Sequence, residues 1–293
     1  MNKLRSEFLL ICCLLVLAGV NALGQDSKQL RHFMQQGPLP STAVPYGNNP
    51  KAGHYVKSGD ARIYYEVYGR GKPIVIMHGG IFGSTVEMGR FIDSLSKNNK
   101  VMAVSTRGHG KSEMGKSEPN YEQKARDINA IIQEETSDSV TVLGFSDGAY
   151  TGYYLAATFP AKVKKLVAIG AGTWKKGWRD FKVTKEMAFG LDSLYWKQQV
   201  TLSPEPQRID EWFTSISKMY SSIEVKKDLF KAIKCPVLVL SGELDQNAPL
   251  ETVIDAYRLI PRAQLGIIPS APHPVFLVNF DAVWASMKPF LLL

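Results

Sequence analysis

The 293-residue chain contains only three cysteines and five histidines. Cys12 and Cys13 fall in an N-terminal segment that we expect to be removed, which leaves Cys235 alone. A single cysteine cannot form an intramolecular disulfide, so the chain is not a small disulfide-stapled domain. No two histidines stand at the spacing of a zinc-binding pair, and we predict no metal site. The five are His32, His54, His78, His109 and His273.

The sequence also lacks an apolar run long enough to cross a membrane. Residues 8–20 are uncharged and mostly apolar, but a helix that spans a bilayer needs about 20 such residues. Lys3 and Arg5 precede this run, and a small-residue cleavage motif ends at Gly24. This order is typical of a secretory signal peptide. We therefore predict that residues 1–24 are cleaved and that the protein is periplasmic or secreted, with no stable membrane insertion.

Two other interpretations of the N-terminus stay open. One is attachment of a lipid at Cys12 or Cys13, for which the preceding apolar run is short. The other is retention of the segment as an uncleaved anchor. Both would tether the protein to a membrane, and we regard both as less favoured than cleavage.

Basic residues are only moderately more numerous than acidic ones. The chain has 35 basic and 27 acidic residues, a net charge of +8, without an arginine-rich stripe or a nucleic-acid motif. We predict no nucleic-acid partner, and we relate the charge mainly to solubility. With 45% hydrophobic residues, the chain can bury one sizeable core. We predict one domain over residues 54–293, preceded by a linker or extension over residues 25–53 that is rich in Gln, Pro, Gly and Asn.

Strand and helix signals alternate along most of this domain, which predicts a parallel sheet covered by helices on both faces. The apolar strand signals stand at residues 73–77, 101–104, 140–145, 163–169, 237–240 and 265–268. An antiparallel hairpin is expected before them, around Gly59. Residues 172–234 contain no strand signal but hold most of the tryptophans. We predict that they form a helical cap over the carboxyl edge of the sheet, where ligands bind in open α/β sheets.

The stretch around Ser146 contains the strongest functional motif. The strand signal at 140–145 runs into Gly144-Phe145-Ser146-Asp147-Gly148. This G-x-S-x-G pattern is typical of a nucleophile elbow, in which a serine stands on a strained turn between a strand and a helix. Gly144 and Gly148 lack the β-carbons that would collide where strand and helix pack closely. We predict Ser146 as a nucleophile.

A serine nucleophile needs a base to take its proton and a carboxylate to orient that base. Asp245 follows the strand signal at 237–240, and His273 follows the one at 265–268. Both should therefore lie at the same sheet edge as Ser146, and the order Ser, Asp, His is the one expected of this architecture. We predict His273 as general base and then acid, and Asp245 as its orienting group. Glu243 is the alternative carboxylate.

An oxyanion hole requires two backbone N–H groups that point at the developing negative charge. Asp147, the residue after the nucleophile, should supply one of them. Gly80, in the loop after the strand signal at 73–77, is placed to supply the other. We expect His78 to be a structural hydrogen-bonding residue rather than a second base.

These motifs together resemble the α/β-hydrolase superfamily, from about Tyr55 to the end of the chain. The resemblance lies in His78-Gly79-Gly80, Arg107-Gly108-His109-Gly110-Lys111-Ser112, Gly144-Phe145-Ser146-Asp147-Gly148, Gly242–Asp245 and His273. It implies a mostly parallel eight-stranded sheet with a helical cap, and esterase, lactonase, amidase, thioesterase or carbon–carbon hydrolase activity without a cofactor. Pro272 and Pro274 make the His273 loop stiffer than is usual in the family.

Within the superfamily, the Ser-Asp-Gly elbow looks most like the valacyclovir-hydrolase-like and small carboxylesterase branch. That likeness implies that Asp147 favours a substrate with an α-amino group. The alternative is that the Asp147 side chain points into the sheet or to a backbone donor. Basic residues outnumber acidic ones in 172–234, which leaves anionic substrates open as well. Aromatic residues that we expect to line the substrate pocket are Trp174, Trp178 and Trp212.

We therefore predict an exported serine hydrolase, of the carboxylesterase type, that cleaves small ester, amide or lactone substrates through an acyl-enzyme. One alternative is a binding protein or sensor with this fold and negligible turnover. Another is an amino-acid ester hydrolase or aminopeptidase. We expect a monomer or a homodimer.

Overall fold

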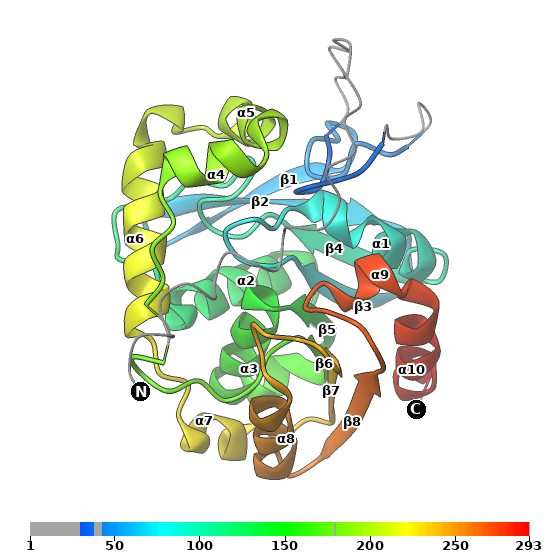
Figure 1. The fold of residues 1–293 in the computed structure, drawn as a ribbon. Coiled ribbons are helices and arrows are strands. Elements are labelled where there is room, and N and C mark those ends of the chain that lie inside the picture. Colours follow the sequence, from blue (N-terminus) through cyan, green and yellow to red (C-terminus); the bar gives the residue numbers. More distant parts are fainter. Residues whose placement is uncertain (1–29, 38–42, 179, 293) are drawn as a thin grey trace, which may run out of the picture.

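A single eight-stranded sheet forms the centre of the molecule (Figure 1), in a computed structural model that describes residues 30–37, 43–178 and 180–292. The strand order is β1-β2-β4-β3-β5-β6-β7-β8. The strands are β1 (Gly53–Ser58), β2 (Ala61–Tyr68), β3 (Lys72–Met77), β4 (Asn99–Val104), β5 (Val140–Phe145), β6 (Val163–Ile169), β7 (Val237–Gly242) and β8 (Ala263–Ile268). β1 and β2 form the expected antiparallel hairpin, and β2 pairs antiparallel with β4. All other pairs are parallel.

Helices cover both faces of this sheet, and the sheet separates two apolar cores. One face carries α2 (Tyr121–Glu135), α3 (Asp147–Thr158), α7 (Lys227–Ala232) and α8 (Leu250–Leu259). The other carries α1 (Gly89–Leu95), α9 (Val275–Val278) and α10 (Phe280–Leu292). Short 3₁₀ turns are η2 (Thr85–Met88), η3 (Pro160–Lys162) and η4 (Pro206–Arg208). Because the central strands are apolar on both faces, as β7 illustrates with all of its residues buried, they require two covering layers. The predicted fold class is confirmed.

Three further helices lie over one edge of the sheet (Figure 1). They are α4 (Lys185–Leu191), α5 (Ser193–Leu202) and α6 (Ile209–Ser222), and all come between β6 and β7. Helix α6 is strongly amphipathic, and Trp212, Ile216 and Tyr220 lie at i, i+4 and i+8 on its buried face. Helix α7, which also belongs to the segment predicted as a cap, packs instead against α3 and α8.

Residues 30–37, part of the segment predicted as a linker, pack against the cap. Met34 donates its backbone N–H to Asp192 at 2.7 Å, and the Arg31 guanidinium lies 3.2 Å from the same carboxylate. The Phe33 ring stacks on Phe82, with ring centroids 4.4 Å apart. The predicted signal peptide, residues 1–24, lies outside the described residues. Among the residues that are described, no helix is both long and apolar enough to span a bilayer.

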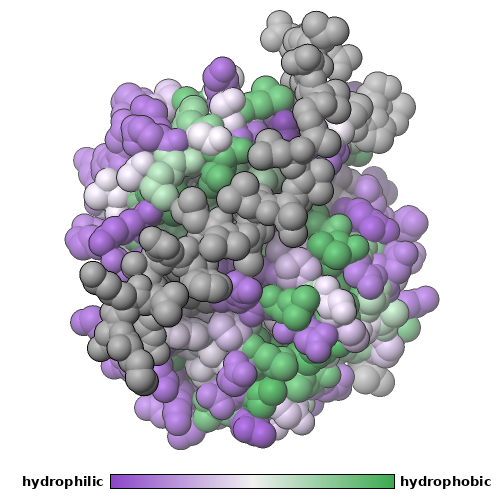
Figure 2. Space-filling view, viewed as in Figure 1, coloured by the Kyte–Doolittle hydropathy of each residue, from purple (hydrophilic) through white to green (hydrophobic). Residues whose placement is uncertain are grey.

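The visible outer face is mixed in character (Figure 2), with polar side chains between small groups of apolar ones. Leu244 and Val278 are among the large apolar side chains that remain exposed. Small exposed apolar groups are normal on folded proteins. They do not by themselves indicate an interface.

A buried ion pair fixes the loop that follows β4. The Arg107 guanidinium donates two hydrogen bonds to Asp127 on α2, at 2.8 and 2.7 Å. It also donates to Asp60 in the hairpin turn, at 2.7 Å, and to the Ser58 carbonyl, at 3.0 Å. Because the Arg107 and Asp127 side chains are only 4% and 2% exposed, neither charge can be compensated by water. This residue therefore ties the loop, the hairpin and α2 together.

Replacing Arg107 by Met should lower the free energy of unfolding by about 3–5 kcal/mol, because Asp127 is then left buried without a counter-charge. Urea unfolding measures the change. Lys218→Met is the matched control, since Lys218 pairs with Glu118 at 2.9 Å on the surface, and we expect it to cost less than about 1 kcal/mol. Equal losses in the two variants would contradict this role of Arg107.

Candidate active site

Ser146 stands on a strained turn between β5 and α3. Its backbone has φ of 50° and ψ of −111°, a left-handed region that a residue with a side chain rarely adopts. The turn fits only because the neighbouring backbone comes very close. A β-carbon on Gly144 would lie 2.3 Å from the Gly148 carbonyl oxygen, and one on Gly148 would lie 2.7 Å from the His78 carbonyl oxygen. Both glycines are therefore required sterically.

The structure brings the three predicted triad residues together at the carboxyl edge of the sheet. The Oγ of Ser146 lies 2.9 Å from the Nε2 of His273. The Nδ1 of the same ring lies 2.8 Å from the Oδ2 of Asp245. Because a carboxylate can only accept, Nδ1 carries the proton and Nε2 presents its lone pair to the serine hydroxyl. Pro272 and Pro274 do not move the imidazole out of reach.

Asp245 is held in place by further hydrogen bonds. Its Oδ1 accepts the backbone N–H groups of Asn247, at 2.8 Å, and Ala248, at 2.7 Å. The Ser241 hydroxyl donates to its Oδ2 at 3.2 Å. Burial by itself would raise the pKa of Asp245, but the charge and hydrogen bond of His273 together with these donors hold it below its usual value. The carboxylate therefore stays ionised.

Glu243, the alternative carboxylate, has a different role. It is exposed, and its Oε2 accepts the backbone N–H of Ser270 at 2.9 Å. It therefore braces the loop that follows β8, while Asp245 faces the imidazole.

The loop after β3 places Gly80 beside the nucleophile turn. A β-carbon on Gly80 would lie 3.3 Å from the Cβ of Asp147, so the two residues predicted for an oxyanion hole are neighbours. Neither backbone N–H donates to a protein acceptor in the part of the chain that the structure describes. Both groups are thus available for an oxygen atom that develops negative charge.

His78 is structural, as its contacts show. Its Nδ1 donates to the Gly79 carbonyl at 2.7 Å, and its Nε2 accepts the Thr106 backbone N–H at 3.1 Å. Burial lowers the pKa of this imidazole to about 4. A neutral ring with both nitrogens bonded has no lone pair left to act as a base.

The Asp147 carboxylate is buried and paired inside the protein. Its Oδ2 lies 2.6 Å from the Nζ of Lys124 on α2, and its Oδ1 accepts the Tyr220 hydroxyl of cap helix α6 at 2.7 Å. The Lys124 and Asp147 side chains are 2% and 1% exposed. Burial would raise the pKa of Asp147, but the Lys124 ammonium and the two hydrogen bonds outweigh it and lower that pKa. The Asp147 side chain therefore points into the protein and not toward a substrate. Its partners are two side chains rather than the backbone donor that this alternative named.

The three tryptophans predicted for the pocket have three different environments. Trp212 is buried and lines a cavity between cap and core. Trp174 is buried against Tyr220, with the rings stacked at 6.1 Å. Trp178 is 42% exposed. A substrate contact for each of them stays a prediction.

Sequence reasoning missed three residues that bond to Asp147 or to the loop that carries Gly80. Lys124 lies in the middle of α2, where a lysine usually faces water, and Tyr220 is one of several aromatics in the cap. Glu87, in η2, accepts the Gly79 backbone N–H at 2.7 Å and so supports the loop that carries Gly80. A signal was available only for Lys124, because it stands on the apolar face of an otherwise amphipathic helix. In the described ranges, no group of three or more His, Cys, Asp or Glu residues is arranged to hold a metal ion.

The chain is similar to known proteins in both sequence and structure. A family model described as the alpha/beta hydrolase fold matches residues 72–199. The chain is similar to the serine hydrolase BPHL of Homo sapiens, with 24% identity over 84% of this chain and 87% of that protein. It is similar to a pimeloyl-[acyl-carrier protein] methyl ester esterase of Vibrio campbellii, with 22% identity over 78% and 98%. Among solved structures, an enol-lactonase from Burkholderia xenovorans aligns with a TM-score of 0.68 and 19% identity, over 82% of this chain and all of that one.

Glu87 should make the stability of the protein depend on pH. Burial raises its pKa from 4.5 to about 8, so between these values the folded state holds a proton that the unfolded state has released. Stability therefore falls as the pH rises through this window. Glu87→Gln keeps an Oε1 for the Gly79 N–H and stays neutral, so it should lack this decline.

Urea unfolding of both proteins at about pH 5 and about pH 8 measures the effect. The variant should gain stability relative to the wild type between the two conditions, by as much as about 4 kcal/mol at 1.36 kcal/mol for each pH unit. A difference between the proteins that is the same at both pH values would show that Glu87 is already charged at about pH 5.

Proposed function

Because the chain belongs to the α/β-hydrolase superfamily, we propose that it is a serine hydrolase that cleaves small ester-type substrates through an acyl-enzyme on Ser146. The observation that carries the proposal is the pair of contacts made by His273. Its ring lies 2.9 Å from the Ser146 hydroxyl and 2.8 Å from the Asp245 carboxylate. A hydroxyl, an imidazole and a buried carboxylate in this order are what acyl transfer requires.

In the first half of the reaction, Ser146 Oγ attacks the carbonyl carbon of the ester while His273 Nε2 takes its proton. The carbonyl oxygen becomes an oxyanion, which accepts hydrogen bonds from the Gly80 and Asp147 N–H groups. Its collapse breaks the ester bond, and the departing alcohol oxygen takes the proton from His273. An acyl group is left on Ser146.

In the second half, a water molecule gives a proton to His273 Nε2 and its oxygen attacks the acyl carbon. The new oxyanion collapses, the bond to Ser146 Oγ breaks, and the serine regains a proton from the imidazole. Asp245 stays ionised throughout and stabilises the imidazolium that forms in each half. The products are a carboxylic acid and an alcohol, and the enzyme is restored.

Two features favour an ester with an uncharged acyl group over an amino-acid ester. Both oxygens of Asp147 are already bonded, one to Lys124 and one to Tyr220. An ammonium group on the substrate would have to displace a buried lysine that carries the same charge. Asp147 thus has a structural role in this proposal. The amino-acid ester hydrolase or aminopeptidase alternative then has no carboxylate at this position to bind the amino group of its substrate.

The proposal includes export of the protein to the periplasm or the medium, after cleavage at about Gly24. The basis is the pattern of residues 1–24, in which a basic start, an apolar run and small residues follow one another.

Replacing Ser146 by Ala should lower turnover of p-nitrophenyl acetate on the order of 10⁶-fold, because the triad acts as a unit. Asp245→Asn should cost about 10⁴-fold, because it favours the wrong imidazole tautomer. Glu243→Gln is the matched control, and we expect it to retain wild-type turnover. Release of p-nitrophenol measures all four proteins. Equal rates for the wild type and Ser146→Ala would remove the assignment, and a large loss in Glu243→Gln would move the orienting role to that residue.

The wild type should hydrolyse the p-nitrophenyl ester of alanine no faster than the propionate ester, a neutral analogue without the amino group. The measurement is kcat/KM for each ester, with N-acetylalanine as a third acyl group. The double variant Lys124→Met/Asp147→Asn removes both buried charges together and should leave this ratio unchanged. A wild-type preference for the alanine ester of about tenfold or more, lost in the double variant, would instead identify Asp147 as an amine-binding residue.

A further inference from the structure

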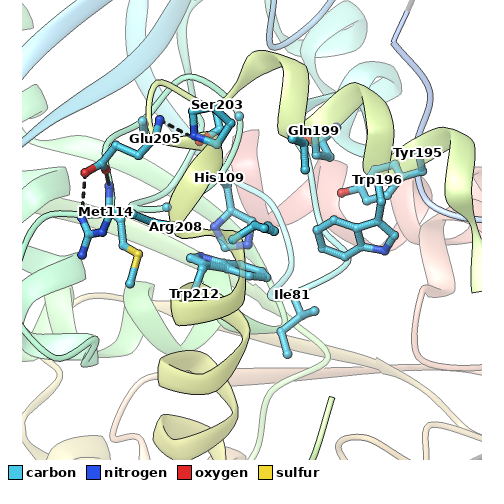
Figure 3. A pocket seen from close by; sticks show the side chains of 16 residues that line it. Ile81, His109, Met114, Tyr195, Trp196, Gln199, Ser203, Glu205, Arg208 and Trp212 are labelled. Atoms are coloured by element: carbon cyan, nitrogen blue, oxygen red, sulfur yellow. Dashed lines mark hydrogen bonds and ion pairs between the residues drawn. The ribbon is translucent and has the colours of Figure 1, made fainter. Parts of the chain in front are cut away.

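A cavity separates the cap from the loops that follow β3 and β4 (Figure 3). Its volume is about 40 Å³. Binding sites for small molecules are lined mainly by apolar side chains, with a few polar groups that fix the orientation of the ligand. Here the apolar walls include Ile81 from the loop after β3, Trp196 from α5 and Trp212 from α6. The two indoles lie 5.9 Å apart, centre to centre.

Three polar side-chain atoms of the lining residues have no hydrogen-bond partner within the described ranges: the Nε2 atoms of His109 and Gln199 and the indole Nε1 of Trp196. His109 and Gln199 are only 6% and 9% exposed, and both also line a second, smaller cavity that adjoins the first. Buried polar groups are almost always paired in folded proteins. Two unpaired ones at the meeting point of two cavities indicate a ligand group that is not part of the chain.

The chemistry of that group follows from the protonation of His109. Its Nδ1 lies 3.3 Å from the Arg107 carbonyl oxygen, which can only accept, and 3.1 Å from the Thr106 hydroxyl. The proton is therefore on Nδ1, and Nε2 presents a lone pair. Burial lowers the pKa of His109 to about 3, so the ring is neutral. The Gln199 amide nitrogen, in contrast, is a donor.

We propose that this cavity binds a substrate arm that is apolar along its length and ends in a neutral hydroxyl group. The hydroxyl donates to His109 Nε2 and accepts from Gln199 Nε2. A carboxylate has no proton to give to the His109 lone pair, and an ammonium has no lone pair for the amide. The nearest guanidinium, Arg208, is already paired with Glu205 and Glu211, each at 2.6 Å. Because the walls are aromatic, a phenol is the matching end group.

The inference places the reacting carbonyl at Ser146, and neither Ser146 nor His273 lines the cavity itself. Ile81 follows Gly80 directly in the chain. Along α6, Trp212 faces the cavity and Tyr220 reaches Asp147, and these residues are a little over two turns or about 12 Å apart. A 6-(4-hydroxyphenyl)hexanoyl arm is of that length. The inference rests on the proposed function, because it takes Ser146 as the point of attack.

Calorimetric titration of the wild-type protein with three small probes tests the site without turnover. The probes are 4-ethylphenol, which can donate and accept, 4-ethylanisole, which can only accept, and ethylbenzene, which can do neither. We expect 4-ethylphenol to bind about tenfold or more tightly than the other two. In Gln199→Met, which keeps the length of the side chain, this advantage should fall to about twofold. Gln133→Met, at an exposed position of α2, is the matched control and should keep it.

Hydrolysis gives the second readout. The wild type should prefer the p-nitrophenyl ester of 6-(4-hydroxyphenyl)hexanoate over that of 6-phenylhexanoate by a similar factor in kcat/KM, and Gln199→Met should lose the preference. Equal binding of the phenol and the anisole, or an advantage that survives in Gln199→Met, would show that His109 and Gln199 do not bind the hydroxyl and would overturn the proposal. Phenol binding without ester hydrolysis would instead contradict the proposed function and leave the binding site standing.

Discussion

A serine held with a positive φ at the end of β5 is the constraint on which the arrangement of this site depends. The strain at Ser146 is tolerated because β5 and α3 pack closely at Gly144 and Gly148. The turn points the hydroxyl out of the sheet edge, and the same turn leaves the Asp147 N–H without an intrahelical partner. One local distortion thus presents both the attacking oxygen and one donor for the oxyanion.

The residues around this turn connect it to helices that are distant in the sequence. The Asp147 carboxylate joins α2 through Lys124 and the cap through Tyr220, while Glu87 of η2 supports the neighbouring loop through the Gly79 N–H. Charged groups are buried here at a cost that only close pairing offsets. The arrangement places a cap helix in direct contact with the residue that follows the nucleophile, so the position of the cap and the shape of the oxyanion hole are physically linked.

The sheet, its parallel core and the convergence of Ser146, Asp245 and His273 could be predicted because each depends on local pattern. Apolar runs mark strands that are buried on both faces, and residues that follow parallel strands meet at one edge. The burial of Lys124 had a signal in the sequence, but its pairing with Asp147, and that of Tyr220, could not be predicted in this way. Lys124 and Tyr220 are distant from it in sequence, and only packing of α2 and α6 brings them to the carboxylate. For the same reason the unpaired atoms of His109 and Gln199 could not be predicted, because their burial depends on how the cap packs on the core.

The most direct test of the account is whether Ser146 is chemically activated. A fluorophosphonate probe reacts with serine hydroxyls that have a working base, and digestion followed by mass spectrometry locates the adduct. We predict rapid labelling of the wild-type protein on the peptide that contains Ser146, and none in a variant that lacks the His273 imidazole. An unlabelled wild-type protein would contradict the account and leave a hydrolase fold that binds ligands without turning them over. An adduct on another serine would contradict the assignment of Ser146.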